Sequence, residues 1–445
     1  MNLFLILFLF LCKNIKNIVI KIPFKKEKIT SISSLLDNNI YTTIELGTPI
    51  QKLKISIFFN EINLVIPCLN FSSISNNFFN QSKSKTFYNE SLFTMIRLEN
   101  KYRFEYQEFR GKFSTENFYF LDENNNKIKF EKFGFLQSFS DLNFNNISII
   151  KNGFVGLKFK EIFNNIDQNI LYQLKNSKNE NFINSYSISI IYNDKFSGNI
   201  FIGDFPHEFE PKKFSFEYFK NKHINLDFYN FNWKINFDKI YYLNETNFEY
   251  DLTLTAKFDL NFGGILANFN YQKNVNKSFF NDLFNKKKCE NKIIKQKENK
   301  EIFYVYECDK NININKFNEN IYFYSKEFNF TFVLDKNDLF LKFNNKIYFL
   351  AFFSNYFPNW ILGEPFFKKF NMIFNQEKKI VGFYSDFKKI KKNYDKIIII
   401  FLLICLIVCL LFFIFKIYFK KNKKIRANEL EDNYVYEAKN YYTKI

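Results

Sequence analysis

Two short segments of this sequence carry acidic side chains that could act together in catalysis. The first segment reads Phe58-Phe-Asn-Glu61 and the second reads Asp259-Leu-Asn-Phe262. Two carboxylates a few ångströms apart cannot both ionise, so such a pair holds one proton and serves as acid and base together. Each segment offers only one carboxylate, and the two stand at different positions. Glu61 is therefore either a solvated turn residue or a displaced partner of Asp259.

Other kinds of catalytic or cofactor site find no support in the sequence. The only histidines, His207 and His223, stand in polar surroundings, where surface positions are expected. We find no Cys and His spacing typical of a metal site, no phosphate-binding loop and no dinucleotide fingerprint. The sequence therefore predicts neither a metal nor a cofactor.

The composition allows a two-lobed globular protein. The chain has 445 residues and a formal net charge of +18, but Lys is interleaved with Asn and Phe and forms no single basic stripe. This distribution argues against a nucleic-acid partner. From residue 40 to 385, alternating Phe, Ile, Tyr and Val are broken by polar clusters about every ten residues, which is typical of all-β folds. With only 11 Gly, each one marks a backbone that needs positive φ or close approach.

Both ends of the sequence carry apolar segments of different lengths. Residues 1–18 contain an apolar run too short to cross a membrane, and we interpret them as a secretory signal peptide, with a buried N-terminal strand as the alternative. Residues 19–39 are assigned to a short pro-segment or linker. Residues 397–415 are uncharged and long enough to span a bilayer. Lysines flank this span on both sides, so its orientation rests on the signal peptide.

These ends predict a single-pass type I membrane protein. The ectodomain would lie in the lumen of the secretory pathway or outside the cell, and residues 416–445 would form a cytosolic tail. Cys289 and Cys308 flank a Lys-rich loop and are expected to form a disulfide, which leaves Cys68 unpaired. Seven Asn-x-Ser/Thr sequences permit glycosylation: Asn70, Asn80, Asn89, Asn146, Asn244, Asn276 and Asn329.

A series of motifs in the first half of the chain resembles the pepsin-like aspartic proteases. Gly47-Thr-Pro-x-Gln51 and Asn63-Leu-Val-Ile-Pro67 are similar to the family motifs around the first catalytic aspartate. Further matches follow in the family's order: Phe79-Asn-Gln-Ser-Lys-Ser-Lys-Thr-Phe87, Asn152-Gly-Phe-Val-Gly-Leu157 and Ser197-Gly-Asn-Ile-Phe-Ile-Gly-Asp204. Counting forward from Gly47 and back from Asn63 leads to Phe58, where the family carries its first aspartate.

The second half repeats this resemblance. Trp233-Lys-Ile-Asn-Phe-Asp-Lys-Ile240 is similar to a family motif, and Ala256-Lys-Phe-Asp259 stands where the second catalytic aspartate is introduced. The segment Trp360-Ile-Leu-Gly-Glu-Pro-Phe-Phe-Lys-Lys-Phe-Asn-Met-Ile-Phe374 matches the family's closing segment without a gap. The resemblance implies a bilobal double β-barrel, with an N-terminal lobe at residues 40–206 and a C-terminal lobe at 207–386.

The same resemblance implies that the catalytic machinery is altered. Family members carry Asp-Thr-Gly turns in which each Thr braces the opposite loop, and both turns are changed here. Tyr106 is the candidate flap tyrosine in Tyr106-Gln-Glu-Phe-Arg-Gly111, with an ordinary strand tyrosine as the alternative. The family's flap glycines are missing there, and about two residues of length are lost. The positions expected to line the cleft or flap, or to plug the cleft, are Phe59, Asn60, Tyr106, Leu260, Asn261 and Phe262.

We therefore expect a membrane-anchored, catalytically inactive relative of these proteases. Phe58 has no ionisable group, so Asp259 is left as the remnant of the pair. The expected partner is a polypeptide bound in the cleft between the lobes of a monomeric ectodomain. The alternative is an active endopeptidase that uses Asp259 with an unusual partner such as Glu61.

Overall fold

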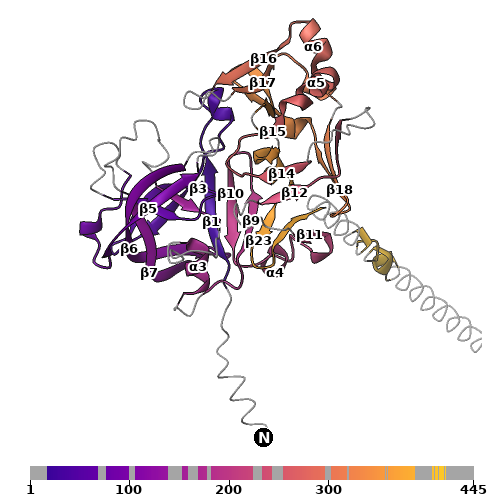
Figure 1. Cartoon of the computed structure of the whole chain (residues 1–445). Coiled ribbons are helices and arrows are strands. Elements are labelled where there is room, and N and C mark those ends of the chain that lie inside the picture. Colours follow the sequence, from indigo (N-terminus) through magenta and orange to yellow (C-terminus); the bar gives the residue numbers. More distant parts are fainter. Residues whose placement is uncertain are drawn as a thin grey trace, which may run out of the picture. The chain divides into compact units, whose positions relative to one another are not determined.

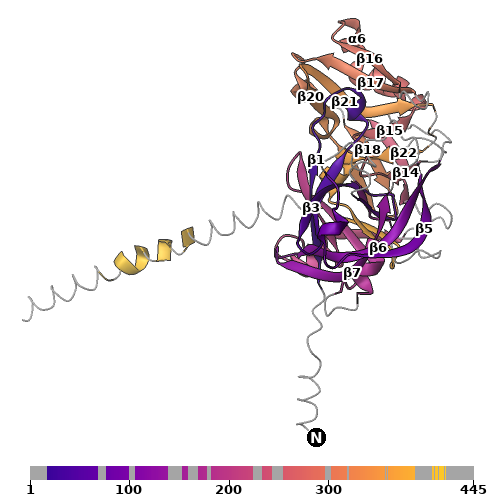
Figure 2. The same cartoon turned by 90° about the vertical axis from the view of Figure 1, so that its left-hand side faces the viewer.

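The chain forms two compact units, residues 1–385 and 386–445. The computed structural model (Figures 1 and 2) describes residues 18–68, 77–99, 106–138, 153–158, 169–177, 182–223, 233–242, 254–295, 302–317, 320–355, 357, 359–385, 403–404, 406–408, 410–414 and 416. Strands dominate the first unit, and its described α-helices have only four to seven residues. This confirms the predicted mostly-β class. The α-helices of this unit are α3 (Ile170–Lys175), α4 (Pro206–Phe209), α5 (Gln272–Val275), α6 (Asn281–Asn285), α7 (Lys336–Leu339) and α8 (Glu364–Phe370).

The largest sheet has 13 strands and contains strands from both halves of the chain. One of its C-terminal strands, β23, pairs with β9, so the sheet joins the two halves through backbone hydrogen bonds. In order across the sheet, the strands are β11 (Phe219–His223), β24 (Ile380–Tyr384), β23 (Ile373–Asn375), β9 (Ser187–Tyr192), β10 (Ser197–Ile202), β1 (Ile20–Lys26), β2 (Ile40–Leu46), β3 (Gln51–Phe58), β8 (Phe154–Gly156), β4 (Leu64–Pro67), β7 (Lys127–Ser138), β6 (Tyr106–Asp122) and β5 (Tyr88–Glu99).

Two further sheets belong to the C-terminal half, where Figure 1 shows them in orange tones. One consists of β12 (Lys234–Asn236), β14 (Thr255–Phe258), β22 (Trp360–Leu362), β15 (Ile265–Asn268), β21 (Lys346–Ser354), β17 (Ile302–Asp309), β16 (Cys289–Lys295) and β20 (Phe340–Phe343). The other consists of β13 (Lys239–Tyr242), β18 (Ile321–Ser325) and β19 (Phe330–Leu334).

The alternation of side chains explains why these segments form strands. In β3, Leu53, Ile55 and Ile57 are buried, while the residues between them are at least partly exposed. Successive side chains of a strand point to opposite faces, so this period of two places one apolar face on the core. The buried aromatic residues form many edge-to-face pairs, for example between Phe258 and Phe374, a geometry that aromatic rings prefer.

The same strand arrangement occurs once in each half. In the first half, β3 runs parallel to β8, which is antiparallel to β4, and β4 runs parallel to β7. In the second half, β14 runs parallel to β22, which is antiparallel to β15, and β15 runs parallel to β21. This repetition defines an N-terminal and a C-terminal lobe, with a loop at the end of β3 in the first and at the end of β14 in the second.

The N-terminal segment contributes a strand to the fold. Within residues 19–39, which are assigned above to a possible pro-segment or linker, β1 lies inside the 13-stranded sheet between β10 and β2. Ile20, Ile22 and Phe24 are at most 4% exposed, because their alternation places them on the core face. Ile18 is also buried and donates its N–H to Phe182 O. Residues 1–17 lie outside the described part.

The second unit is described only at positions of one helix. Residues 403–404, 406–408, 410–414 and 416 are helical, and their side chains are exposed. Within the described residues, none of the helices combines the length and the apolar character that crossing a membrane requires. Much of the predicted span at 397–415, and all but residue 416 of the predicted tail, lies outside the described part.

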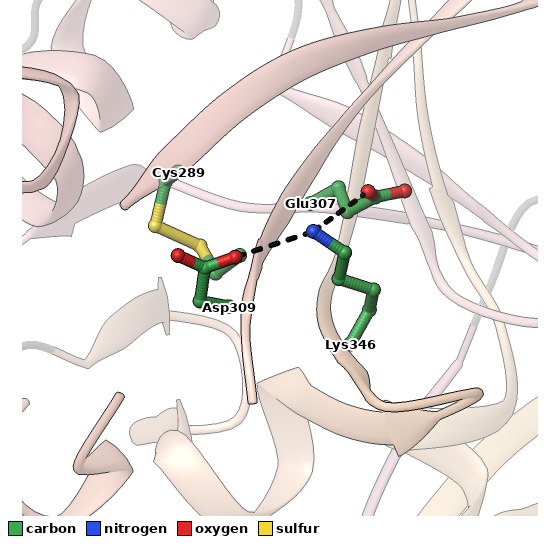
Figure 3. Close-up of a disulfide and its surroundings, with 5 residues drawn as sticks. Cys289, Glu307, Asp309 and Lys346 are labelled. Atoms are coloured by element: carbon green, nitrogen blue, oxygen red, sulfur yellow. Dashed lines mark hydrogen bonds and ion pairs between the residues drawn. A yellow bond between two sulfur atoms is a disulfide. The ribbon is translucent and has the colours of Figure 1, made fainter. Parts of the chain in front are cut away.

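The predicted disulfide is present. Cys289 on β16 and Cys308 on β17 lie directly opposite each other and are joined. Beside this disulfide, Lys346 Nζ lies 3.2 Å from Asp309 Oδ1 and 3.5 Å from Glu307 Oε1 (Figure 3). Cys68 is unpaired and buried, and burial raises the pKa of its thiol, which keeps the thiol neutral and unreactive.

Candidate functional site

Two loops of matching geometry follow β3 in the N-terminal lobe and β14 in the C-terminal lobe. In the N-terminal lobe, Phe58 is paired with Gly156 across the parallel strands β3 and β8. In the C-terminal lobe, Phe258 is paired with Leu362, so the next residues along the two strands are Asp259 and Gly363. Phe58 and Asp259 therefore stand at equivalent positions in the two lobes, each beside a glycine.

The two glycines are needed because the loops cross other backbone at close range. A Cβ atom on Gly156 would lie 2.4 Å from the carbonyl oxygen of Glu61. A Cβ atom on Gly363 would lie 2.3 Å from the carbonyl oxygen of Phe262. Glu61 and Phe262 are each the fourth residue of their loop, so the two crossings match residue for residue.

The Asn261 side chain ties the second loop to the first. Its Oδ1 accepts a hydrogen bond of 2.9 Å from Phe59 N, and its Nδ2 donates one of 2.6 Å to Ile57 O. Asn261 is 4% exposed, so both bonds are shielded from water. One amide thus satisfies a donor and an acceptor on either side of Phe58, which is the bracing contact that the resemblance assigns to threonine hydroxyls.

The Asp259 carboxylate is buried and is used within its own loop. Asp259 is 4% exposed, and its Oδ1 accepts a 3.0 Å hydrogen bond from Asn261 N. Asp259 N donates to Leu362 O at 3.1 Å, and Phe262 N donates to Asp259 O at 3.1 Å. This carboxylate therefore helps to hold the bracing residue Asn261 in place.

Three of the residues expected to line or plug the cleft are buried. Phe59, Leu260 and Phe262 are at most 1% exposed. The Phe59 ring packs edge-to-face on Phe374 at 4.8 Å, and the Phe262 ring packs on Phe352 at 5.7 Å. Their aromatic and aliphatic side chains lose more water contact in these clusters than they would in an open groove. The loops thus turn their apolar side chains inward.

The remaining first-loop residues are half-buried. The Phe58 ring packs edge-to-face on Phe154 at 5.3 Å. Asn60 Oδ1 is enclosed and has no hydrogen-bond partner in the described part of the chain. The Glu61 carbonyl oxygen accepts a 2.8 Å bond from Lys158 N. Whether its carboxylate acts with Asp259 stays a prediction.

The segment with the candidate flap tyrosine lies in a strand. Residues 106–111 form the first part of β6 and pair with β5. Tyr106 is paired with Glu99 and Gly111 with Thr94. Residues 100–105 lie outside the described part, as does the Tyr106 side chain. The β5 and β6 ladder satisfies the backbone groups that a turn would leave open.

A polar cluster beneath the second loop was not predicted. Asn38 is fully buried, and its Nδ2 donates to Leu260 O at 2.7 Å and to the Tyr192 hydroxyl at 3.2 Å. Asn38 N also donates to Asn261 O at 2.7 Å. Burial, together with the Glu364 carboxylate, raises the pKa of Tyr192 well above its usual value. The segment before β2 thus supports the backbone of the second loop.

A buried ion pair lies next to this cluster. Glu364 begins α8, and its N–H donates to Phe262 O at 2.8 Å. Its carboxylate pairs with Lys26 at the end of β1, and both side chains are under 10% exposed. Lys368 adds a second contact at 3.3 Å. In the sequence, only the short motif Gly363-Glu-Pro could have indicated this ion pair. No motif around Lys26 indicates that it is the partner of Glu364.

The predicted surface sites are only partly described. Asn89 and Asn329 have exposed side chains, which permits glycosylation there. Asn80 is half-buried, and Asn276 Oδ1 accepts a hydrogen bond from the Tyr306 hydroxyl, so Asn276 is a poor acceptor site. Asn70, Asn146 and Asn244 lie outside the described residues.

The histidines have structural contacts. His207 Nδ1 lies 2.8 Å from the Tyr384 hydroxyl, and His223 Nδ1 lies 3.0 Å from Lys378 O. Burial lowers the pKa of His207. Across the ranges that the structure describes, no group of three His, Cys, Asp or Glu side chains could hold a metal ion. The site therefore rests on Asp259 and the loops around it.

Comparisons with known proteins bear on the fold. No protein-family model matches the chain, and no curated protein matches it by sequence. Among solved structures, it is similar to the basic 7S globulin from soybean, with a TM-score of 0.57 at 12% identity. The match covers 83% of this chain and 96% of the globulin chain. At this identity the likeness concerns the fold alone, and it supports a bilobal, pepsin-like fold.

Proposed function

We propose that this protein is a catalytically inactive, pepsin-like protein that binds a polypeptide segment in a cleft between its lobes. In this proposal each lobe is a β-barrel of the pepsin type. The observation that carries the proposal is Phe58 at the position equivalent to Asp259. General acid–base catalysis contributes roughly 10² to 10⁴ in rate, and a phenylalanine can neither share nor transfer the proton.

The contacts that hold the loops support retention of a binding role. Asn261 braces the first loop, and a glycine allows the close backbone crossing in each lobe. Both loops therefore stay in position although the pair of catalytic acids is missing. The half-buried Phe58 ring offers an apolar contact at the position where a protease would hold water. A polypeptide is the ligand that a cleft of this fold accommodates.

The membrane anchor belongs to this proposal. Residues 397–415 contain no charged side chain, and apolar residues such as Leu411 and Phe412 expose 60% and 74% of their surface in the described helix. Exposed apolar side chains of this kind are stabilised by lipid. The ectodomain would be a monomer in the secretory-pathway lumen or outside the cell, with a short basic tail in the cytosol.

A peptide library separates an inactive binder from an active enzyme. The full-length chain, purified in a nonionic detergent, is incubated with the library at acidic pH, and products and bound peptides are identified by mass spectrometry. We expect bound peptides and no cleavage. Cleavage that disappears in Asp259→Ala would overturn the proposal and favour an enzyme using Asp259 with a partner such as Glu61.

A second pair of variants tests where the peptides bind. Phe58→Lys should weaken binding about tenfold or more, because loss of one buried aromatic contact costs about 1.5–3 kcal/mol. Phe58→Leu is the matched control and should retain most of the binding. Equal binding by both variants would place the peptides away from the loops and contradict a cleft site.

A further inference from the structure

Three strands of the N-terminal lobe diverge and leave an opening in its wall. Among the described strands, β1 pairs with β6 only through Ile20 and Lys21. It pairs with β2 only through Lys25 and Lys26. β2 in turn meets β6 only at its last two residues. Between these contacts no ladder connects the three strands, and a cavity of about 470 Å³ lies there. Figure 2 shows β1, β3 and β6 in this part of the molecule.

The inner surface of the opening is apolar. The side chains that face it from the three strands are each at most 7% exposed: Ile22, Phe24, Ile44, Phe118 and Phe120. Its lining continues to Leu64, Val155 and Ile170, which come from β4, β8 and α3. A cavity of this size falls within the range of small-molecule sites, roughly 300–1,000 Å³.

The rim of the opening is basic. Lys21 and Lys25 line it, and a second, more open hollow that shares Lys25 continues to Lys195 and Phe196. In the described part of the chain, no ion pair engages any of these three lysines, and Lys21 Nζ donates to an amide oxygen, Asn125 Oδ1, at 2.7 Å. Phe196 is 58% exposed.

Two acidic side chains stand near these lysines, and both are already engaged. Asp194 accepts bonds from Ser197 Oγ at 2.6 Å and from Phe196 N at 2.6 Å. Glu45 pairs with Lys127 and with Lys52. The rim therefore keeps an excess of positive charge, which would attract an anionic group.

We propose that this opening binds an amphipathic organic anion of the medium-chain carboxylate class. The apolar body enters between β1, β2 and β6, where its own apolar surface is transferred from water to an apolar lining. The carboxylate stays at the rim between Lys21 and Lys25, where lysine ammonium groups donate charge-assisted hydrogen bonds. This inference does not depend on peptide binding at the loops.

Photolabelling of the full-length chain tests the site directly. The probe is decanoate with a diazirine near its methyl end, and labelled peptides are identified by mass spectrometry. We expect labels in residues 20–26, 40–46 or 118–121 that unlabelled decanoate suppresses. A decyltrimethylammonium analogue should label this site at least fivefold less. Labels elsewhere only, or equal labelling by the cationic analogue, would overturn the proposal.

Variants at the exposed rim keep the test specific. Thr43 lines the opening and is exposed, so Thr43→Trp should block entry and reduce labelling at least fivefold, while Thr43→Val should not. Lys21→Glu combined with Lys25→Glu should reduce labelling at least fivefold, and Lys310→Glu, at an exposed site in the other lobe, should leave it unchanged. Normal melting temperatures check that the variants fold. Unchanged labelling in the folded Thr43→Trp and double-Glu variants would contradict the site.

Discussion

The two loops share one backbone design and differ in the chemistry of their side chains. The first loop follows β3 and the second follows β14, and in each a loop carbonyl lies close against a glycine, Gly156 or Gly363. The first loop presents Phe58, which is half-buried, where the second presents the buried carboxylate of Asp259. The two loops therefore share one backbone geometry, but only the second has a carboxylate, that of Asp259, at this position.

The asparagines at the third position of each loop, Asn60 and Asn261, also differ in their hydrogen bonding. Asn261 makes two hydrogen bonds across to the first loop, whereas Asn60 Oδ1 is enclosed without a partner in the described part. A buried polar atom that lacks a partner costs free energy, while a paired one roughly breaks even. The second loop thus stabilises the first, and no equivalent contact from Asn60 is described in return.

The largest effects should come from the two glycine crossings. Gly156→Ala and Gly363→Ala each place a Cβ atom within 2.4 Å of a backbone carbonyl oxygen, which cannot move aside as a side chain could. We expect each variant to lose more than about 3 kcal/mol of stability. Chemical denaturation measured by circular dichroism checks this. A marked difference between the two variants would break the equivalence of the lobes.

The next effect compares neighbouring phenylalanines in the first loop. Phe59→Ala removes a ring that is 1% exposed and should cost about 3–5 kcal/mol. Phe58→Ala removes a half-buried ring and should cost clearly less, because part of that ring already contacts water. The denaturation midpoints of both variants provide the measurement. Equal losses would mean that Phe58 is a core residue and not a contact available to ligands.

The two asparagines should also differ. Asn261→Ala leaves Phe59 N and Ile57 O buried without partners, so we expect a loss of about 2–4 kcal/mol. Asn60→Ala removes an oxygen that already lacks a partner and should change stability by less than about 1 kcal/mol. Thermal melting of both variants measures the difference. A large loss in Asn60→Ala would show that the bracing is mutual.

Much of this arrangement could be predicted from sequence because it depends on local patterns. Alternating apolar residues located the strands, and the scarcity of glycine made Gly156 and Gly363 informative about close approach. The disulfide followed from two cysteines around one loop. These signals are visible in a single sequence because each one reflects a constraint on neighbouring residues.

The contacts that depend on distant residues could not be predicted. Nothing near Lys26 indicates that its ammonium pairs with Glu364, which is 338 residues away. Whether Phe59 and Phe262 line or plug the cleft was left open for a related reason, since a loop residue faces inward only if distant residues supply a place for it. Phe59 packs on Phe374, and Phe262 packs on Phe352. The alternation of Ile20, Ile22 and Phe24 carries a strand signal, and these residues lie in β1.

The smallest predicted effect concerns two neighbouring carboxylates, those of Asp204 and Glu208. Phe205 N lies 3.2 Å from Asp204 Oδ1 and 3.3 Å from Glu208 Oε2, so both carboxylates point at one N–H. Burial, followed by the hydrogen bond with Glu208, raises the pKa of Asp204 to about 7. Between about pH 4 and about pH 7 the folded protein therefore holds a proton that the unfolded chain has released. Its stability should fall as pH rises across this range and level off above it.

Asp204→Asn should remove this loss of stability between about pH 4 and about pH 7, because the amide does not titrate. The measurement is the difference in melting temperature between Asp204→Asn and the unaltered protein across this range. The lowered pKa of His207 acts with the opposite sign, but it acts in both proteins and cancels in the difference. Asp194→Asn is the matched control: its exposed carboxylate has a lowered pKa and should leave the slope unchanged. A slope that persists in Asp204→Asn would contradict this assignment.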